Sequence, residues 1–147
     1  MSSFLDMKTF QPQKSTTFSV KQVNNNWSPV TGTIADVAYE NNVTGATISL
    51  NSTCEKYQDS PLKHLMKNLI AGIPDKKIIK DKTFKLDGRE ALRTELSATA
   101  DGVPVKVEAV VMRKNFCVYD FMHSAQPKYF AKSKKDFDKF LESFHAD

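Results

Sequence analysis

The sequence predicts an α+β fold in which an antiparallel β-sheet of about six to seven strands is flanked by two main helices, an α/β/α-type sandwich. Alternating apolar and polar residues recur through the middle of the chain, and Asp-Gly pairs separate several of these runs. Two further segments have apolar residues at helical spacing, typical of helices that cover a sheet. A chain of 147 residues can bury a core as one domain, so we expect a loose N-terminal segment over residues 1–17 and a single domain over residues 18–147.

The first half of the chain contains short strands and one clear helix. Residues 18–23 alternate weakly as a strand, residues 24–29 are expected to form a loop, and residues 34–41 and 45–53 are expected to be strands. Ser60 is a suitable N-cap and Pro61 a suitable first helical residue. The helix then carries one apolar stripe, formed by Leu62, Leu65, Met66, Leu69, Ile70 and Ile73. Gly72 and Pro74 are expected to end it.

The second half is expected to form four adjacent strands and a closing helix. The strands cover residues 78–86, 90–99, 103–113 and 116–124, and their turns are Asp87-Gly88, Asp101-Gly102 and Lys114-Asn115. The closing helix is expected to restart at Ser133, which has Asp136 three residues later as in a capping box. Its buried face is expected to contain Phe130, Phe137, Phe140, Leu141 and Phe144.

The side chains that could carry chemistry form no catalytic or metal-binding motif. Cys117 and His123 lie too far apart along one strand to touch, and Cys54 could approach only His64, which belongs to no motif. The three histidines have no metal-ligand spacing, and no phosphate-binding or hydrolase motif occurs. We therefore expect no enzyme, no metal and no cofactor. The cysteine spacing leaves two alternatives open: two buried thiols, or one Cys54–Cys117 disulfide formed in an oxidising compartment.

Lysines dominate the charge of the chain. The net charge is +4, and the segments 75–93 and 128–139 each carry three more basic than acidic residues. Because Arg is scarce, we expect no nucleic-acid partner. If both segments share a face, they could contact an acidic protein or anionic lipid, whereas solvated lysines protecting an edge strand are the alternative. The candidate contact surface comprises Lys76, Lys77, Lys80, Lys82, Lys132, Lys134 and Lys135.

Several short sequence segments resemble the PsbP-like (Mog-type) fold family, and the resemblance covers about residues 18–145. They are residues 87–94, 101–105, 117–121 and the closing helix from Tyr129 to Phe144. The family includes extrinsic photosystem subunits, a Ran-GTPase-interacting protein and bacterial envelope proteins, often lipoproteins. The resemblance implies a non-catalytic binding or assembly module, and Asn51-Ser52-Thr53-Cys54 with Cys117 resembles a subgroup with paired cysteines.

Compartment and ligand are not fixed by these patterns. Residues 1–13 contain no basic leader and no lipobox. The sequence therefore favours either a cytoplasmic protein or a mature chain whose leader has been removed, and the resemblance implies the periplasm or cell envelope. The partner is expected to be another protein. The alternative is a small ligand or lipid held in a pocket between sheet and helix, and a third hypothesis is an enzyme that uses Cys54.

Overall fold

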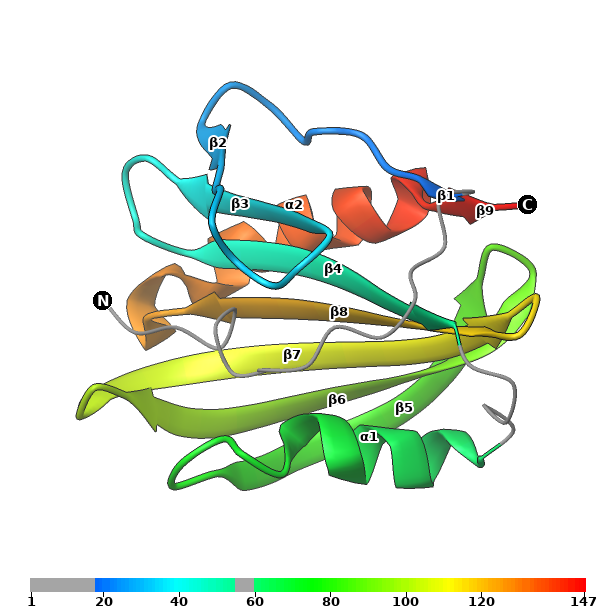
Figure 1. The fold of residues 1–147 in the computed structure, drawn as a ribbon. Helices are drawn as coiled ribbons and strands as arrows, with labels where there is room; N and C mark the ends of the chain where they lie inside the picture. The colour runs from blue at the N-terminus through cyan, green and yellow to red at the C-terminus, as the bar shows by residue number, and fades with distance from the viewer. Residues whose placement is uncertain (1–17, 55–59) are drawn as a thin grey trace.

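The protein has the predicted three-layer arrangement. The computed structural model describes residues 18–54 and 60–147, and the predicted loose segment over residues 1–17 lies outside them. A seven-stranded antiparallel sheet is covered by α1 (Leu62–Ile70) on one face and by α2 (Pro127–Ser143) on the other (Figure 1). The predicted α+β fold class is therefore confirmed. No helix in the described ranges is long and apolar enough to cross a bilayer.

The four long strands are neighbours in the chain and in the sheet. The sheet order is β2-β3-β4-β8-β7-β6-β5, so β5 forms one edge and β2 the other. Its strands are β2 (Trp27–Pro29), β3 (Val37–Asn41), β4 (Thr47–Cys54), β5 (Lys77–Leu86), β6 (Arg89–Ala100), β7 (Val103–Lys114) and β8 (Cys117–Ala125). A second sheet pairs β1 (Phe18–Ser19) with β9 (His145–Ala146), which places the first described residues beside the C-terminus (Figure 1).

Two of the three predicted turns are confirmed and the third is displaced by one residue. Asp87-Gly88 and Asp101-Gly102 adopt positive φ at both positions, as a type I′ turn requires. The β7–β8 turn lies at Asn115-Phe116, because Lys114 still pairs with Cys117. This displacement changes every pair along the hairpin, and it decides which side chains meet beneath α2.

Three local predictions were wrong. Residues 27–29 form strand β2 instead of loop, since an edge strand tolerates Pro29. Pro61 is the N-cap of α1 and no side chain caps this helix, so Ser60 has no capping role. The second helix begins at Pro127 instead of restarting at Ser133, because proline at the first helical position is already in helical geometry.

The two faces of the sheet contain different cores. On the α1 side, three valines of β7 pack with leucines of β6 and with stripe residues of α1: Val105, Val107, Val111, Leu92, Leu96, Met66 and Ile70. On the α2 side the core is aromatic: Phe121, Phe140 and Phe144 form edge-to-face contacts with centroids 5.1–6.4 Å apart. The aromatic face predicted for the closing helix is therefore confirmed, and α2 rests on the side of the sheet that also holds the polar residues described next.

Candidate functional site

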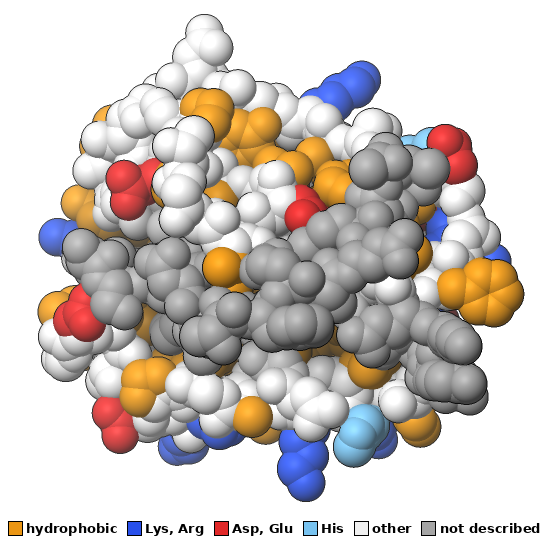
Figure 2. All heavy atoms as spheres, in the orientation of Figure 1, with side chains coloured by type: hydrophobic (Ala, Val, Ile, Leu, Met, Phe, Trp, Pro, Cys, Tyr) orange, Lys and Arg blue, Asp and Glu red, His pale blue; other side chains and the backbone are white. Residues whose placement is uncertain are grey.

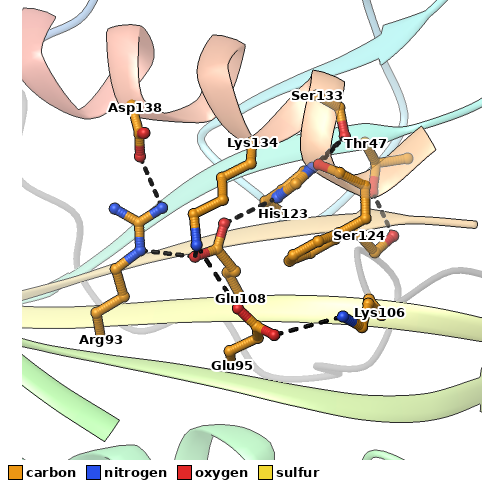
Figure 3. Close-up of polar contacts among 11 residues, drawn as sticks. Thr47, Arg93, Glu95, Lys106, Glu108, His123, Ser124, Ser133, Lys134 and Asp138 are labelled. Carbon is orange, nitrogen blue, oxygen red and sulfur yellow. Dashed lines mark hydrogen bonds and ion pairs between the residues drawn. The ribbon is translucent and has the colours of Figure 1, made fainter. Parts of the chain in front are cut away.

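A buried polar network lies between the sheet and α2. The β7–β8 register pairs Glu108 with His123, so both side chains point to the same face, and α2 places Ser133 against the imidazole (Figure 3). His123 Nε2 lies 2.6 Å from Ser133 Oγ, and His123 Nδ1 lies 3.2 Å from Glu108 Oε1. A strand pair and one helix therefore bring a hydroxyl, an imidazole and a carboxylate into one hydrogen-bonded chain.

The imidazole of His123 is held neutral. It stacks against the rings of Phe130 and Phe137, with centroid distances of 5.1 and 5.2 Å. Burial lowers the pKa of His123 below its ordinary 6.5, although the Glu108 carboxylate opposes this effect. Because a carboxylate can only accept, Nδ1 carries the proton and donates to Glu108, and Nε2 accepts from the Ser133 hydroxyl.

Glu108 is ionised although its side chain is buried. Arg93 Nε donates to its Oε2 at 2.7 Å, and Lys134 Nζ lies 3.3 Å from the same oxygen. Burial alone would raise the pKa of Glu108, but the hydrogen bonds from His123 and Arg93 outweigh it and lower the pKa to about 2. Arg93 also donates to Asp138 Oδ1 at 2.7 Å, so the cation joins β6, β7 and α2.

The connectivity is that of a nucleophile, a general base and a carboxylate that orients the base. The site is nevertheless closed: Ser133, His123 and Glu108 are only 4%, 0% and 1% exposed. The rings of Phe130 and Phe137 stack on the imidazole and Ser133 is buried against it, so a substrate carbonyl could reach Ser133 Oγ only if this packing opened. In this geometry the network links α2 to the sheet by hydrogen bonds, and the Ser133 hydroxyl is inaccessible to a substrate.

Sequence reasoning missed this network. Glu108 belongs to no motif, and the sequence suggests for His123 only a pairing with Cys117 or a metal site, neither of which its spacing supports. The sequence pattern predicts a helix cap at Ser133, whereas its hydroxyl bonds to His123 inside the helix. The usable signal was the hairpin register: a turn at residues 115–116 places Glu108 directly opposite His123.

The predicted basic surface is partly assembled. Lys80, Lys82 and Lys134 line one cleft of about 90 Å³ beside the network, together with Arg93, Glu95, Glu108 and Asp138. Lys77 pairs with Ser97, which places it on the same face of β5 as Lys80. Lys76 instead lines a groove on the α1 side, and Lys132 and Lys135 are exposed on α2. Whether these lysines bind a partner remains a prediction.

An apolar groove lies on the opposite face, between α1 and the β5 edge. Helix α1 packs over β6 and β7, so the inner side of β5 is left uncovered, and a groove of about 390 Å³ results. Its walls include Met66, Ile70 and Leu92, and Ile78 is half-exposed at its margin. Lys63, Lys67 and Lys76 also line it. Figure 2 shows lysine and arginine side chains along the part of this face that α1 occupies.

The β7–β8 hairpin tip carries an exposed aromatic ring. Phe116 is 85% exposed and has φ +67°, a region that bulky residues rarely occupy. A shallow cavity of about 440 Å³ beside it is lined by both apolar and charged side chains: Leu62, Arg89, Glu90, Arg113, Lys114, Asn115 and Phe116. The tip therefore presents an apolar ring among charged groups.

The cysteines are joined. Cys54 at the end of β4 and Cys117 at the start of β8 face each other in the sheet and form a disulfide. Cys54 is thus no free nucleophile in this state, and no group of three or more potential metal ligands occurs within the described ranges. Trp27 is buried and donates from its indole Nε1 to Asp136 Oδ2 at 3.0 Å.

Comparison with known proteins finds similarity in structure alone. No protein-family model matches the sequence, and no curated protein matches it significantly. The CyanoP (PsbP) protein of Synechocystis sp. PCC 6803 aligns with a TM-score of 0.61 and 15% identity over 96% of this chain and 99% of its own. LpqN of Mycobacterium tuberculosis, described as involved in cell envelope biogenesis, aligns with a TM-score of 0.63 and 14% identity over 89% of this chain and 83% of its own. A Mog1 variant aligns with a TM-score of 0.58 and 10% identity over 84% and 87%. The chain therefore has the PsbP/Mog1-like fold, as the sequence segments described above predicted.

Proposed function

We propose that this chain is a non-catalytic binding module of the bacterial cell envelope that acts through another protein. The observation that carries the proposal is the closure of the Ser133–His123–Glu108 network, the one nucleophile–base chain found among the described residues. The features that do reach solvent are a basic cleft, an apolar groove and an aromatic hairpin tip, which are means of binding.

Two further observations support the envelope as the compartment. The Cys54–Cys117 disulfide is typical of proteins that fold in an oxidising environment. LpqN, which shares the fold, is described as involved in cell envelope biogenesis. Alkylating cell extracts with a maleimide of high mass, with and without prior reduction, tests the first point. We expect a mass shift only after reduction, and shifted protein before reduction would contradict an oxidising location.

Crosslinking in intact cells tests the binding role. A photoreactive residue placed at Lys82, at Lys67 or at Phe116 probes the cleft, the groove and the hairpin tip separately. We expect one of the three positions to yield a defined protein adduct in the envelope fraction. Failure of all three under several growth conditions would contradict a protein partner.

A serine-directed fluorophosphonate tests the non-catalytic part. The native protein should remain unlabelled, because Ser133 is buried and its hydroxyl is hydrogen-bonded to the buried His123. Ser133→Ala is the matched control. Labelling of the native protein that disappears in this variant would overturn the proposal and identify a serine enzyme.

A second candidate function rests on the groove beside α1. Its walls are apolar and its rim carries Lys63, Lys67 and Lys76, a combination that suits a small amphiphile with an acyl chain and an anionic head. Native mass spectrometry of protein mixed with dodecanoate should show one bound molecule. A Lys63→Glu/Lys67→Glu variant should bind it more weakly, and equal binding by both proteins would contradict the assignment.

A further inference from the structure

The outer edge of β5 is open. Among the described residues β5 pairs only with β6, and its other side ends the sheet. A bulge at Ile79 interrupts its first residues, after which Lys80–Leu86 pair with β6 without interruption. These seven positions form a regular strand edge with unpaired backbone groups, which is the surface that strand addition requires.

Two lysines of this edge point to the α2 side. Lys80 pairs with Glu95 and Lys82 with Arg93, and all four side chains line the small cleft. Residues two apart in a strand lie about 7 Å from each other on one face, and so do their neighbours on an added strand. The spacing of Lys80 and Lys82 therefore matches alternate side chains of an extended segment.

Among the residues that the structure describes, the other two cations of the cleft are paired, whereas these two lysines are not. Arg93 is paired with Glu108 and Asp138, and Lys134 lies within ion-pair distance of Glu95 and Glu108 (Figure 3). Lys80 and Lys82 make no ion pair in the described part of the chain. The side of the cleft nearest the open edge consequently favours carboxylates.

An open strand edge can pair with the same edge of another copy, and Lys80 and Lys82 disfavour this self-association. Lysine on an edge strand repels another copy of that edge, which is a common protection against aggregation. The same charges attract an acidic strand, so one feature excludes self-pairing and selects a complementary partner.

We propose that β5 accepts an extended acidic segment of a partner protein as an additional strand of the sheet. Backbone hydrogen bonds along residues 80–86 hold the segment, and its alternate carboxylates face Lys80 and Lys82. This inference rests on the proposed protein-binding function and names the surface and the chemistry of its partner.

The test uses a fluorescent peptide of alternating Glu and Thr, titrated with the full chain and followed by anisotropy. The Lys80→Glu/Lys82→Glu variant should bind at least about tenfold more weakly than wild type. Lys63→Glu/Lys67→Glu, which makes the same charge change on the α1 face, should bind within about twofold. Circular dichroism checks that both variants remain folded.

A second peptide separates strand addition from charge attraction. It has the same sequence but N-methyl groups on every second amide. It therefore keeps its carboxylates, but the backbone N–H groups along one edge can no longer donate hydrogen bonds to β5. It should bind at least about tenfold more weakly, and amide exchange should slow in β5 only with the unmodified peptide.

Four results would overturn the inference: no binding at about 1 mM peptide, equal binding of the methylated peptide, equal weakening by the two variants, or displacement of the peptide by phosphatidylglycerol vesicles. The last would assign the surface to a membrane. A protein adduct obtained only at Lys67 or Phe116, with no peptide binding, would refute this inference and leave the proposed function standing. If neither adduct nor peptide binding is found, both fall.

Discussion

Replacing Glu108 with Gln removes one buried negative charge and keeps the size of the side chain. The variant imitates wild-type protein whose Glu108 carboxyl is protonated. In the fold the pKa of this carboxyl is about 2, against an ordinary 4.5, because His123 and Arg93 donate to it despite its burial. At about 1.4 kcal/mol per pH unit, the difference corresponds to about 3 kcal/mol of stability.

The sign of the pH dependence follows from the lowered pKa. As pH falls, the unfolded chain binds the Glu108 proton first, so the stabilisation is complete above about pH 4.5 and disappears towards pH 2. His123 acts in the same direction at higher pH: its lowered pKa makes the unfolded state the better proton binder below about pH 6.5. Because His123 is present in both proteins, its contribution largely cancels when they are compared.

Urea unfolding followed by the fluorescence of buried Trp27 measures this difference. We expect Glu108→Gln to be about 3 kcal/mol less stable than wild type at neutral pH, and the gap to shrink to roughly half by pH 3. Glu142→Gln, which changes an exposed carboxylate of α2, should give no gap that varies in this way. A gap that is absent at neutral pH, or constant between pH 7 and 3, would refute the account of the network.

Three further predictions concern other parts of the fold. Replacing both Cys54 and Cys117 with Ala should lower the free energy of unfolding by roughly 4 kcal/mol, because the disulfide closes a loop that spans 63 positions. A reductant should not change the stability of this variant in chemical denaturation. Phe116→Gly should raise the melting temperature, because glycine tolerates the positive φ that strains Phe116 by about 1 kcal/mol, and because the exposed ring contributes almost no burial. A lower melting temperature would contradict this. Trp27→Phe should lower the free energy of unfolding in urea by about 2 kcal/mol, because the smaller ring fills less of the buried volume and cannot donate a hydrogen bond to Asp136. Asp136→Asn should lower it less, because the amide oxygen of Asn can still accept the hydrogen bond from the indole.

The hairpins and the helix faces could be predicted because their signals are local. Asp87-Gly88 and Asp101-Gly102 specify turns by their own backbone geometry, and alternation along residues 103–111 specifies which side chains share a face. The failures were local as well. Ser133 resembles a helix cap in isolation, but Pro127 already begins the helix six residues earlier.

The candidate site depended on relations between elements. A turn at residues 114–115 would pair Glu108 with Phe121, whereas the turn at residues 115–116 pairs it with His123. The alternation of β7 and β8 alone could not supply that register, because it fits either turn. Similarly, the sequence showed an excess of lysines in two segments, but only the β5–β6 register places Lys80 and Lys82 beside Lys134 and sends Lys76 to another groove.

The sequence by itself determined the periodicities: which residues point to the same side of a strand or helix, where most hairpins turn, and that two helices must cover a sheet. Tertiary structure alone decided that α2 closes over Glu108 and His123 and brings Ser133 to them. The physical reason is that backbone geometry repeats over a few residues and can be read locally. The meeting of three side chains from β7, β8 and α2 depends on register and docking, which are settled by packing across the whole core.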